Sequence, residues 1–133
     1  MAKRRKALHA EILPTEAELV ILQVLWKQGA STVREVHDAL AKRGIGYTTV
    51  LKQMQVMTEK GFLARNERYR SHVYEARAPR ERTQMQMARN LLERAFDGSA
   101  KNLVLGALTS RPVSAAELAE IRKMLDEFEK RQI

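Results

Sequence analysis

The sequence contains no cysteine and no long apolar run. The lack of cysteine excludes disulfides, thiolate nucleophiles, iron–sulfur clusters and cysteine-ligated zinc. No apolar run approaches the roughly 20 residues that a membrane-spanning helix needs. The basic start of the chain, Met1 to Lys6, lacks the apolar stretch of a signal peptide. We therefore expect a cytoplasmic protein that does not insert into a membrane.

Residues that carry out catalysis or bind metals are also scarce. The three histidines, His9, His37 and His72, are far apart and lack a metal-ligand spacing, so surface positions are expected for them. The sequence has neither a glycine-rich phosphate loop nor a Gly-x-Ser-x-Gly nucleophile motif. Glu16 and Glu18 occupy a first helical turn, where carboxylates favour the helix dipole. These observations predict no enzyme, no metal and no cofactor.

Positive charge is what the sequence has in excess. It carries 24 Lys and Arg against 16 Asp and Glu, which gives a net charge of +8. A polyanion, most simply nucleic acid, is the expected partner. Residues 1–78 hold 14 basic and 8 acidic residues, and residues 79–133 hold 10 and 8, so the polyanion surface should lie in the first half. We expect a basic arm over 1–12, one domain over 13–78 and another over 79–133.

The 13–78 domain shows the pattern of three helices followed by a hairpin. Capping boxes at Thr15 to Glu18 and Thr32 to Glu35 open the first two helices. The first helix follows Thr15 up to a stop at Gly29, the second follows Thr32 up to a stop at Gly44, and the third covers Tyr47 to Lys60 with Gly61 as its stop. Two short strands then cover 62–65 and 72–75. This order is typical of a winged helix-turn-helix, with a two-stranded wing.

The third helix and the wing supply the candidate DNA-binding residues. At 100° per residue, one face of this helix is polar and lies opposite an apolar face. The predicted base-reading residues are Thr48, Thr49, Lys52, Gln55 and Val56. The predicted phosphate contacts are Tyr47, Lys60, Arg65, Arg68, Arg70 and His72. An ordinary solvated helix face is the alternative, but it leaves the wing arginines unexplained.

The spacing of apolar residues in the 79–133 segment predicts three helices, each with an apolar face. About 55 residues of this kind make a poor independent domain, and burial of one such side chain is worth roughly 1.5 to 3 kcal/mol. We therefore interpret the segment as a dimerisation region, with packing onto the winged helix as the alternative. Its predicted interface residues are Leu91, Leu92, Leu103, Val104, Leu108, Leu118, Ile121, Leu125 and Phe128.

Several motifs of the chain together resemble those of a known family, the penicillinase and methicillin-resistance repressors (BlaI/MecI). They are Thr15-Glu16-Ala17-Glu18-Leu19, Leu25-Trp26-Lys27, Tyr47-Thr48-Thr49-Val50, Glu59-Lys60-Gly61-Phe62-Leu63 and Val73-Tyr74. The resemblance runs from about Leu13 to the last helix. It implies a homodimeric cytoplasmic winged-helix repressor of resistance or stress genes that binds a double-stranded DNA operator with dyad symmetry.

The resemblance also implies a mode of release. Family members are typically cut in their dimerisation helices by a membrane sensor protease that β-lactam activates, commonly at an Asn-Phe bond. The aligned pair here is Gly106-Ala107, so the expected cleavage region departs from the family pattern. The copper-responsive branch carries a cysteine motif near its C-terminus. Since this chain has no cysteine, copper sensing is disfavoured.

Two rival functions fit parts of the sequence. A MarR-like regulator would bind a small effector between its modules, but such proteins place a dimerisation helix before the winged helix. Only about a dozen residues precede that domain here. A winged helix used as a protein-interaction adaptor would fit the fold alone. The arm Lys3 to Lys6 is either a phosphate-binding tail or a solubilising end.

Overall fold

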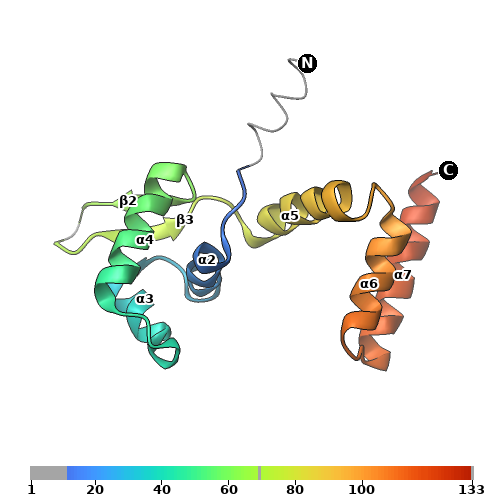
Figure 1. Ribbon diagram of the computed structural model, residues 1–133, viewed down its shortest axis with the longest axis horizontal. Helices are drawn as coiled ribbons and strands as arrows, with labels where there is room; N and C mark the ends of the chain where they lie inside the picture. Colours follow the sequence, from blue (N-terminus) through green and yellow to red (C-terminus); the bar gives the residue numbers. More distant parts are fainter. Residues whose placement is uncertain (1–11, 69, 133) are drawn as a thin grey trace, which may run out of the picture. The chain divides into compact units, whose positions relative to one another are not determined.

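The computed structural model describes residues 12–68 and 70–132. The predicted basic arm lies outside these residues except for Ile12, and so does His9. The chain divides into two compact units between Ala88 and Arg89, inside a helix. Figure 1 traces the helices and strands in chain order. Their bounds are α2 (Glu16–Gln28), β1 (Ser31–Thr32), α3 (Val33–Ala39), η1 (Ala41–Arg43), α4 (Tyr47–Lys60), β2 (Leu63–Asn66), β3 (Val73–Ala76), α5 (Arg80–Ala95), α6 (Ala100–Ser110) and α7 (Ala115–Gln132).

Local capping signals set the bounds of the first helices. Thr15 caps α2 with a reciprocal capping box to Glu18, and Thr32 caps α3 with one to Glu35. The predicted span of the third helix is confirmed, because α4 covers Tyr47–Lys60 and is capped by Gly61, whose φ of 93° is the left-handed conformation that favours glycine. The second helix is shorter than predicted, since α3 ends at Ala39 and the 3₁₀ turn η1 follows.

The wing contains one more strand than predicted. The sheet is antiparallel in the order β1-β3-β2, with Ser31 opposite Tyr74 and Leu63 opposite Ala76. The predicted hairpin strands lie one residue too early. The missed strand β1 is two residues long, and only its pairing with β3 defines it. The fold is nevertheless the expected winged helix followed by a helical region.

The core of the first unit lies between α2, α3, α4 and the sheet. Tyr74, Met54, Met57, Leu63, Val36 and Val50 are its largest fully buried side chains. The start of α5 also belongs to this unit. Trp26, which is partly buried, donates its indole N–H to the Ala78 carbonyl at 2.9 Å, and Thr83 is buried. Thus the helix that begins next to the predicted boundary at Pro79 contributes its first turns to the winged-helix unit.

The second unit comprises the end of α5 together with α6 and α7. Ser99 caps α6 by accepting the backbone N–H of Asn102, and Ser114 accepts that of Glu117 near the start of α7. Within the described part of the chain, α6 and α7 contain no buried residue. None of the helices in residues 12–68 and 70–132 is long and apolar enough to cross a membrane.

Candidate nucleic-acid interface

Helix α4 has an exposed polar face, the predicted reading face, opposite a buried apolar face. Val50, Met54 and Met57 are at most 1% exposed and fix the helix against the core. On the other side, the predicted base-reading residues Thr48, Thr49, Lys52 and Gln55 are exposed, and Val56 is half-buried. Hydroxyl, amide and ammonium groups on one exposed helix face can hydrogen-bond base edges in a major groove.

The first residue of α4 lies beside two side chains from α3. The Arg34 guanidinium carbon is 5.5 Å from the centre of the Tyr47 ring, and the His37 ring meets Tyr47 edge-on at 5.8 Å. Tyr47 itself is 41% exposed. The sequence analysis did not single out Arg34, which is exposed in the first turn of α3, the helix that precedes α4 along the chain. This cluster places a cation and a phenol at the N-terminal end of α4.

The wing brings His72, one of the predicted phosphate contacts, next to the first turn of α4. Tyr47 and His72 line one cavity of about 350 Å³, together with residues of α3 and β3. Arg68, Arg70 and His72 are exposed around the tip. The backbone N–H of Arg68 donates to Asn66 Oδ1 at 2.8 Å, which fixes the turn. The structure therefore gathers the N-terminal end of α4 and the basic wing on one unit.

Arg65 differs from the other wing cations because it has partners within the wing. A hydrogen bond with the Tyr74 side chain, followed by its pairing with Glu67, raises the pKa of Arg65. Tyr74 is buried, so the guanidinium is held against the sheet. A phosphate contact by Arg65 would have to compete with Glu67.

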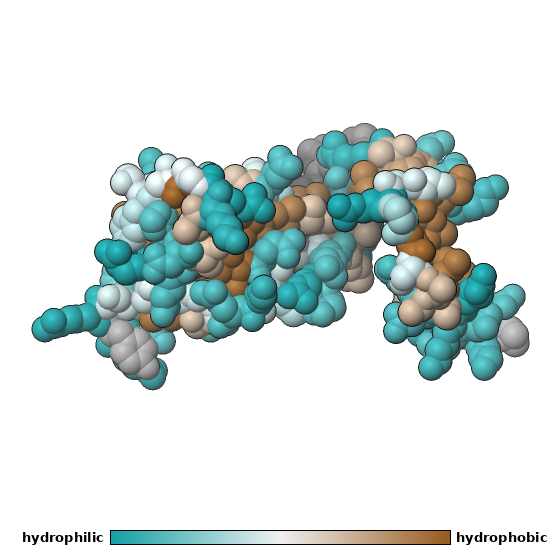
Figure 2. Space-filling model, turned by 90° about the horizontal axis from the view of Figure 1, so that it is seen from below, coloured by the Kyte–Doolittle hydropathy of each residue, from teal (hydrophilic) through white to brown (hydrophobic). Residues whose placement is uncertain are grey.

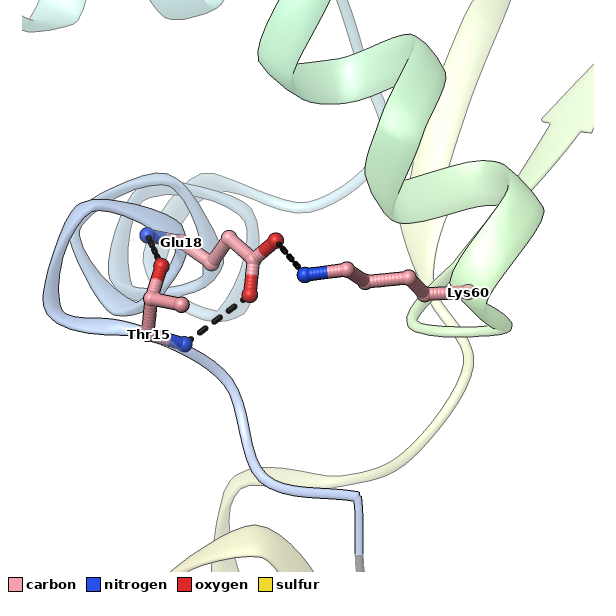
Figure 3. Close-up of polar contacts among 3 residues, drawn as sticks. All are labelled: Thr15, Glu18 and Lys60. Atoms are coloured by element: carbon pink, nitrogen blue, oxygen red, sulfur yellow. Dashed lines mark hydrogen bonds and ion pairs between the residues drawn. The ribbon is translucent and has the colours of Figure 1, made fainter.

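Lys60 also has a partner that the sequence did not reveal. Its Nζ donates to Glu18 Oε2 at 2.7 Å, while Glu18 Oε1 accepts the backbone N–H of Thr15 at 2.9 Å (Figure 3). Burial alone would raise the pKa of Glu18, but the Lys60 and Thr15 hydrogen bonds and the Lys60 charge outweigh it and lower that pKa. The ion pair joins the start of α2 to the last turn of α4.

A second surface consists of apolar side chains on the second unit. Leu91, Val104, Leu125 and Phe128 are between 43% and 58% exposed. The other predicted interface residues, Leu92, Leu103, Leu108, Leu118 and Ile121, are partly buried. Figure 2 shows apolar side chains on the unit that contains α6 and α7. Gly106 is partly buried inside α6, near the Phe96 ring, and Ala107 is exposed.

A comparison of the sequence with known families matches the penicillinase repressor family over residues 14–127. The chain belongs to the penicillinase repressor family. It is 24% identical to the penicillinase repressor of Bacillus licheniformis over 119 residues, which cover 89% of this chain and 93% of that protein. It is 29% identical to the transcriptional regulator BlaI of Mycobacterium tuberculosis over 116 residues, which cover 86% and 83% of the two chains.

Membership in the penicillinase repressor family confirms the resemblance seen in the sequence. The family is one of transcriptional repressors and not of enzymes. Among the described residues, no group of three or more His, Asp or Glu side chains could hold a metal ion. The family match also favours the repressor over the MarR-like and adaptor interpretations.

Proposed function

We propose that this chain is a sequence-specific transcriptional repressor that binds a double-stranded DNA operator through α4 and the wing. The observation that carries the proposal is the exposed polar face of α4 beside a wing bearing Arg68 and Arg70. Base-edge contacts from a helix in the major groove provide specificity, and phosphate contacts from the wing provide register and affinity. The names of the relatives support the same function.

The repressor acts as a homodimer on a dyad operator. The 44 residues from Arg89 to Gln132 form a compact unit, yet the described part of α6 and α7 buries no residue in a single chain. A helical unit of that size has at best a marginal core of its own, and a second copy supplies the missing surface. Two winged helices related by a two-fold axis then engage two half-sites.

Proteolysis between residues 99 and 110 relieves repression by separating the two winged helices. The candidate bond Gly106–Ala107 lies inside α6, so the helix must open locally before a protease can bind it. A glycine in a helix interior lowers the cost of that opening by roughly 0.5–1 kcal/mol relative to alanine. Resistance or stress genes as the targets, and a membrane sensor as the protease, are what the resemblance to the family implies, and the pair Gly106-Ala107 departs from the family's cleavage site.

Selection of bound duplexes from a random DNA library tests this function. The expected product is a dyad whose half-sites are one or more helical turns apart, about 10–10.5 base pairs for each turn. A library without enrichment would contradict sequence-specific binding. An enriched site without two-fold symmetry would contradict the homodimer but would still support sequence-specific DNA binding.

A further inference from the structure

Glu18 is a buried carboxylate whose position excludes direct contact with DNA. It is 2% exposed and lies in the first turn of α2. Both oxygens are engaged, one by the Thr15 backbone and the other by Lys60 Nζ at 2.7 Å (Figure 3). Its partner Lys60 is 42 residues away in sequence and 38% exposed at its side chain. The ion pair is thus a long-range link between two helices, with one end inside the protein.

Lys60 lies at the opposite end of α4 from the reading residues. Lys60 follows Thr48 by twelve positions, which corresponds to about 18 Å along a helix axis. In helix-turn-helix proteins, the N-terminal residues of the recognition helix contact base edges. A tilt of α4 by about 5° around its Lys60 end would therefore move the Thr48 end by about 1.6 Å. This displacement exceeds the range of donor–acceptor distances over which a hydrogen bond forms.

We propose that the Glu18–Lys60 ion pair is a positioning device for operator readout, and that Lys60 acts through Glu18 and not as a phosphate contact. The device rests on the proposed DNA-binding function. It fixes the C-terminal end of α4 against α2, so that the polar face of α4 meets base edges at one angle. Since non-specific binding depends on phosphates and charge, loss of the link reduces discrimination and spares non-specific affinity.

The test compares three variants of the full chain on the selected operator and on a scrambled duplex, each over a series of salt concentrations. Lys60→Met removes the ammonium, Glu18→Gln keeps the shape of the buried side chain, and Arg68→Ala removes an exposed wing cation. We expect Lys60→Met and Glu18→Gln each to lower the operator-to-scrambled affinity ratio about tenfold. The slope of log affinity against log salt should stay at the wild-type value.

Arg68→Ala provides the contrast. This variant should make the slope of log affinity against log salt shallower by about one for each phosphate that is no longer neutralised, or by about two for a dimer. The operator-to-scrambled affinity ratio should stay unchanged. If Lys60→Met behaves like Arg68→Ala, Lys60 binds a phosphate and the proposal is wrong. If Lys60→Met leaves both quantities unchanged, the link does not position the helix. If the wild-type chain shows no preference for any duplex, the proposed function fails instead.

Two further readouts separate positioning from a general loss of stability. Measurements are made well below the unfolding temperature of each variant, and Lys60→Arg, which keeps a donor for Glu18, should restore the ratio. The double variant Glu18→Gln/Lys60→Met should lose no more discrimination than either single variant. Should Lys60→Met fail to fold, Glu18→Gln carries the test, because a residue that is 2% exposed alters readout only through its neighbours. Additive losses in the double variant would overturn the proposal.

Discussion

At the scale of single residues, side chains on α4 and the wing that look alike in the sequence have different surroundings. Lys52 is exposed on the reading face, whereas Lys60 binds a buried carboxylate. Arg68 is exposed, whereas Arg65 is held by Tyr74 and Glu67. The basic residues predicted from the sequence to bind DNA are therefore of two kinds. Some are exposed on the surface, and others already form ion pairs or hydrogen bonds within the protein.

Glu18 makes stability depend on pH in the acidic range. The pKa of Glu18 in the folded protein lies below its ordinary value of 4.5, so the unfolded chain binds the proton more readily. Its stabilisation is present above pH 4.5 and is lost as the pH falls through the lowered pKa. The unfolding free energy of the wild type should fall more steeply with acidification than that of Glu18→Gln, as measured by urea titration. Parallel curves would contradict the assignment.

Readout by α4 can be tested one residue at a time. Replacing Thr48, Lys52 or Gln55 with alanine should relax preference at one base pair in each half-site and weaken operator binding by about 1–3 kcal/mol. Lys27→Ala is the control, because Lys27 is an exposed lysine on α2 outside the predicted interface. Operator titrations with single-base changes provide the measurement. Uniform weakening on every sequence would show that another face of the molecule reads the bases.

At the scale of helices and strands, local signals predicted most of the first unit. The bounds of α2 and α4 follow from a capping box and from glycines at their ends, all of which are local in sequence. Strand β1 could not be predicted, since two residues gain strand character only by pairing with β3 some 40 residues later. The Glu18–Lys60 and Arg34–Tyr47 contacts were missed for the same reason. They depend on how α2 and α3 pack against α4.

Helix α6 contains a glycine, Gly106, that has room for an alanine side chain. A Cβ at Gly106 would lie 3.6 Å from Phe96 Cζ, which is ordinary van der Waals contact. Gly106→Ala should therefore stabilise the helix by about 0.5–1 kcal/mol and slow cleavage within residues 99–110. Thermal unfolding and limited proteolysis measure the two effects. A lower unfolding temperature would show instead that Gly106 permits close approach of a partner helix in the dimer.

At the scale of the whole molecule, the proposed function divides between the two units: DNA binding is assigned to the first and dimerisation to the second. The first unit buries an apolar core between its helices and its sheet. In the second, Leu125 and Phe128 are more than half exposed in the single chain. In the proposed dimer, binding of one half-site raises the effective concentration of the second winged helix at the other half-site, so dimerisation is expected to set the operator affinity.

Leu125→Asp tests this coupling between the units. An unpaired carboxylate in a buried interface costs several kcal/mol, so we expect a monomer whose winged helix stays folded and whose operator affinity falls at least about 100-fold. Ala119→Asp introduces the same charge at an exposed position of α7 outside the apolar stripe and should remain dimeric. Sedimentation and operator titration provide the measurements. A persistent dimer, or a monomer that still binds tightly, would contradict the role given to the second unit.

DNA binding through the basic wing is tested most directly by the salt dependence of operator affinity. Arg68 and Arg70 are exposed, and Lys60 and Arg65 already have carboxylate partners. If all four residues of both subunits reached phosphates, about eight neutralised phosphates would give a log–log slope of about −7. With Lys60 committed to Glu18, about six phosphates remain, and the slope should be about −5. A slope near zero would contradict DNA binding altogether.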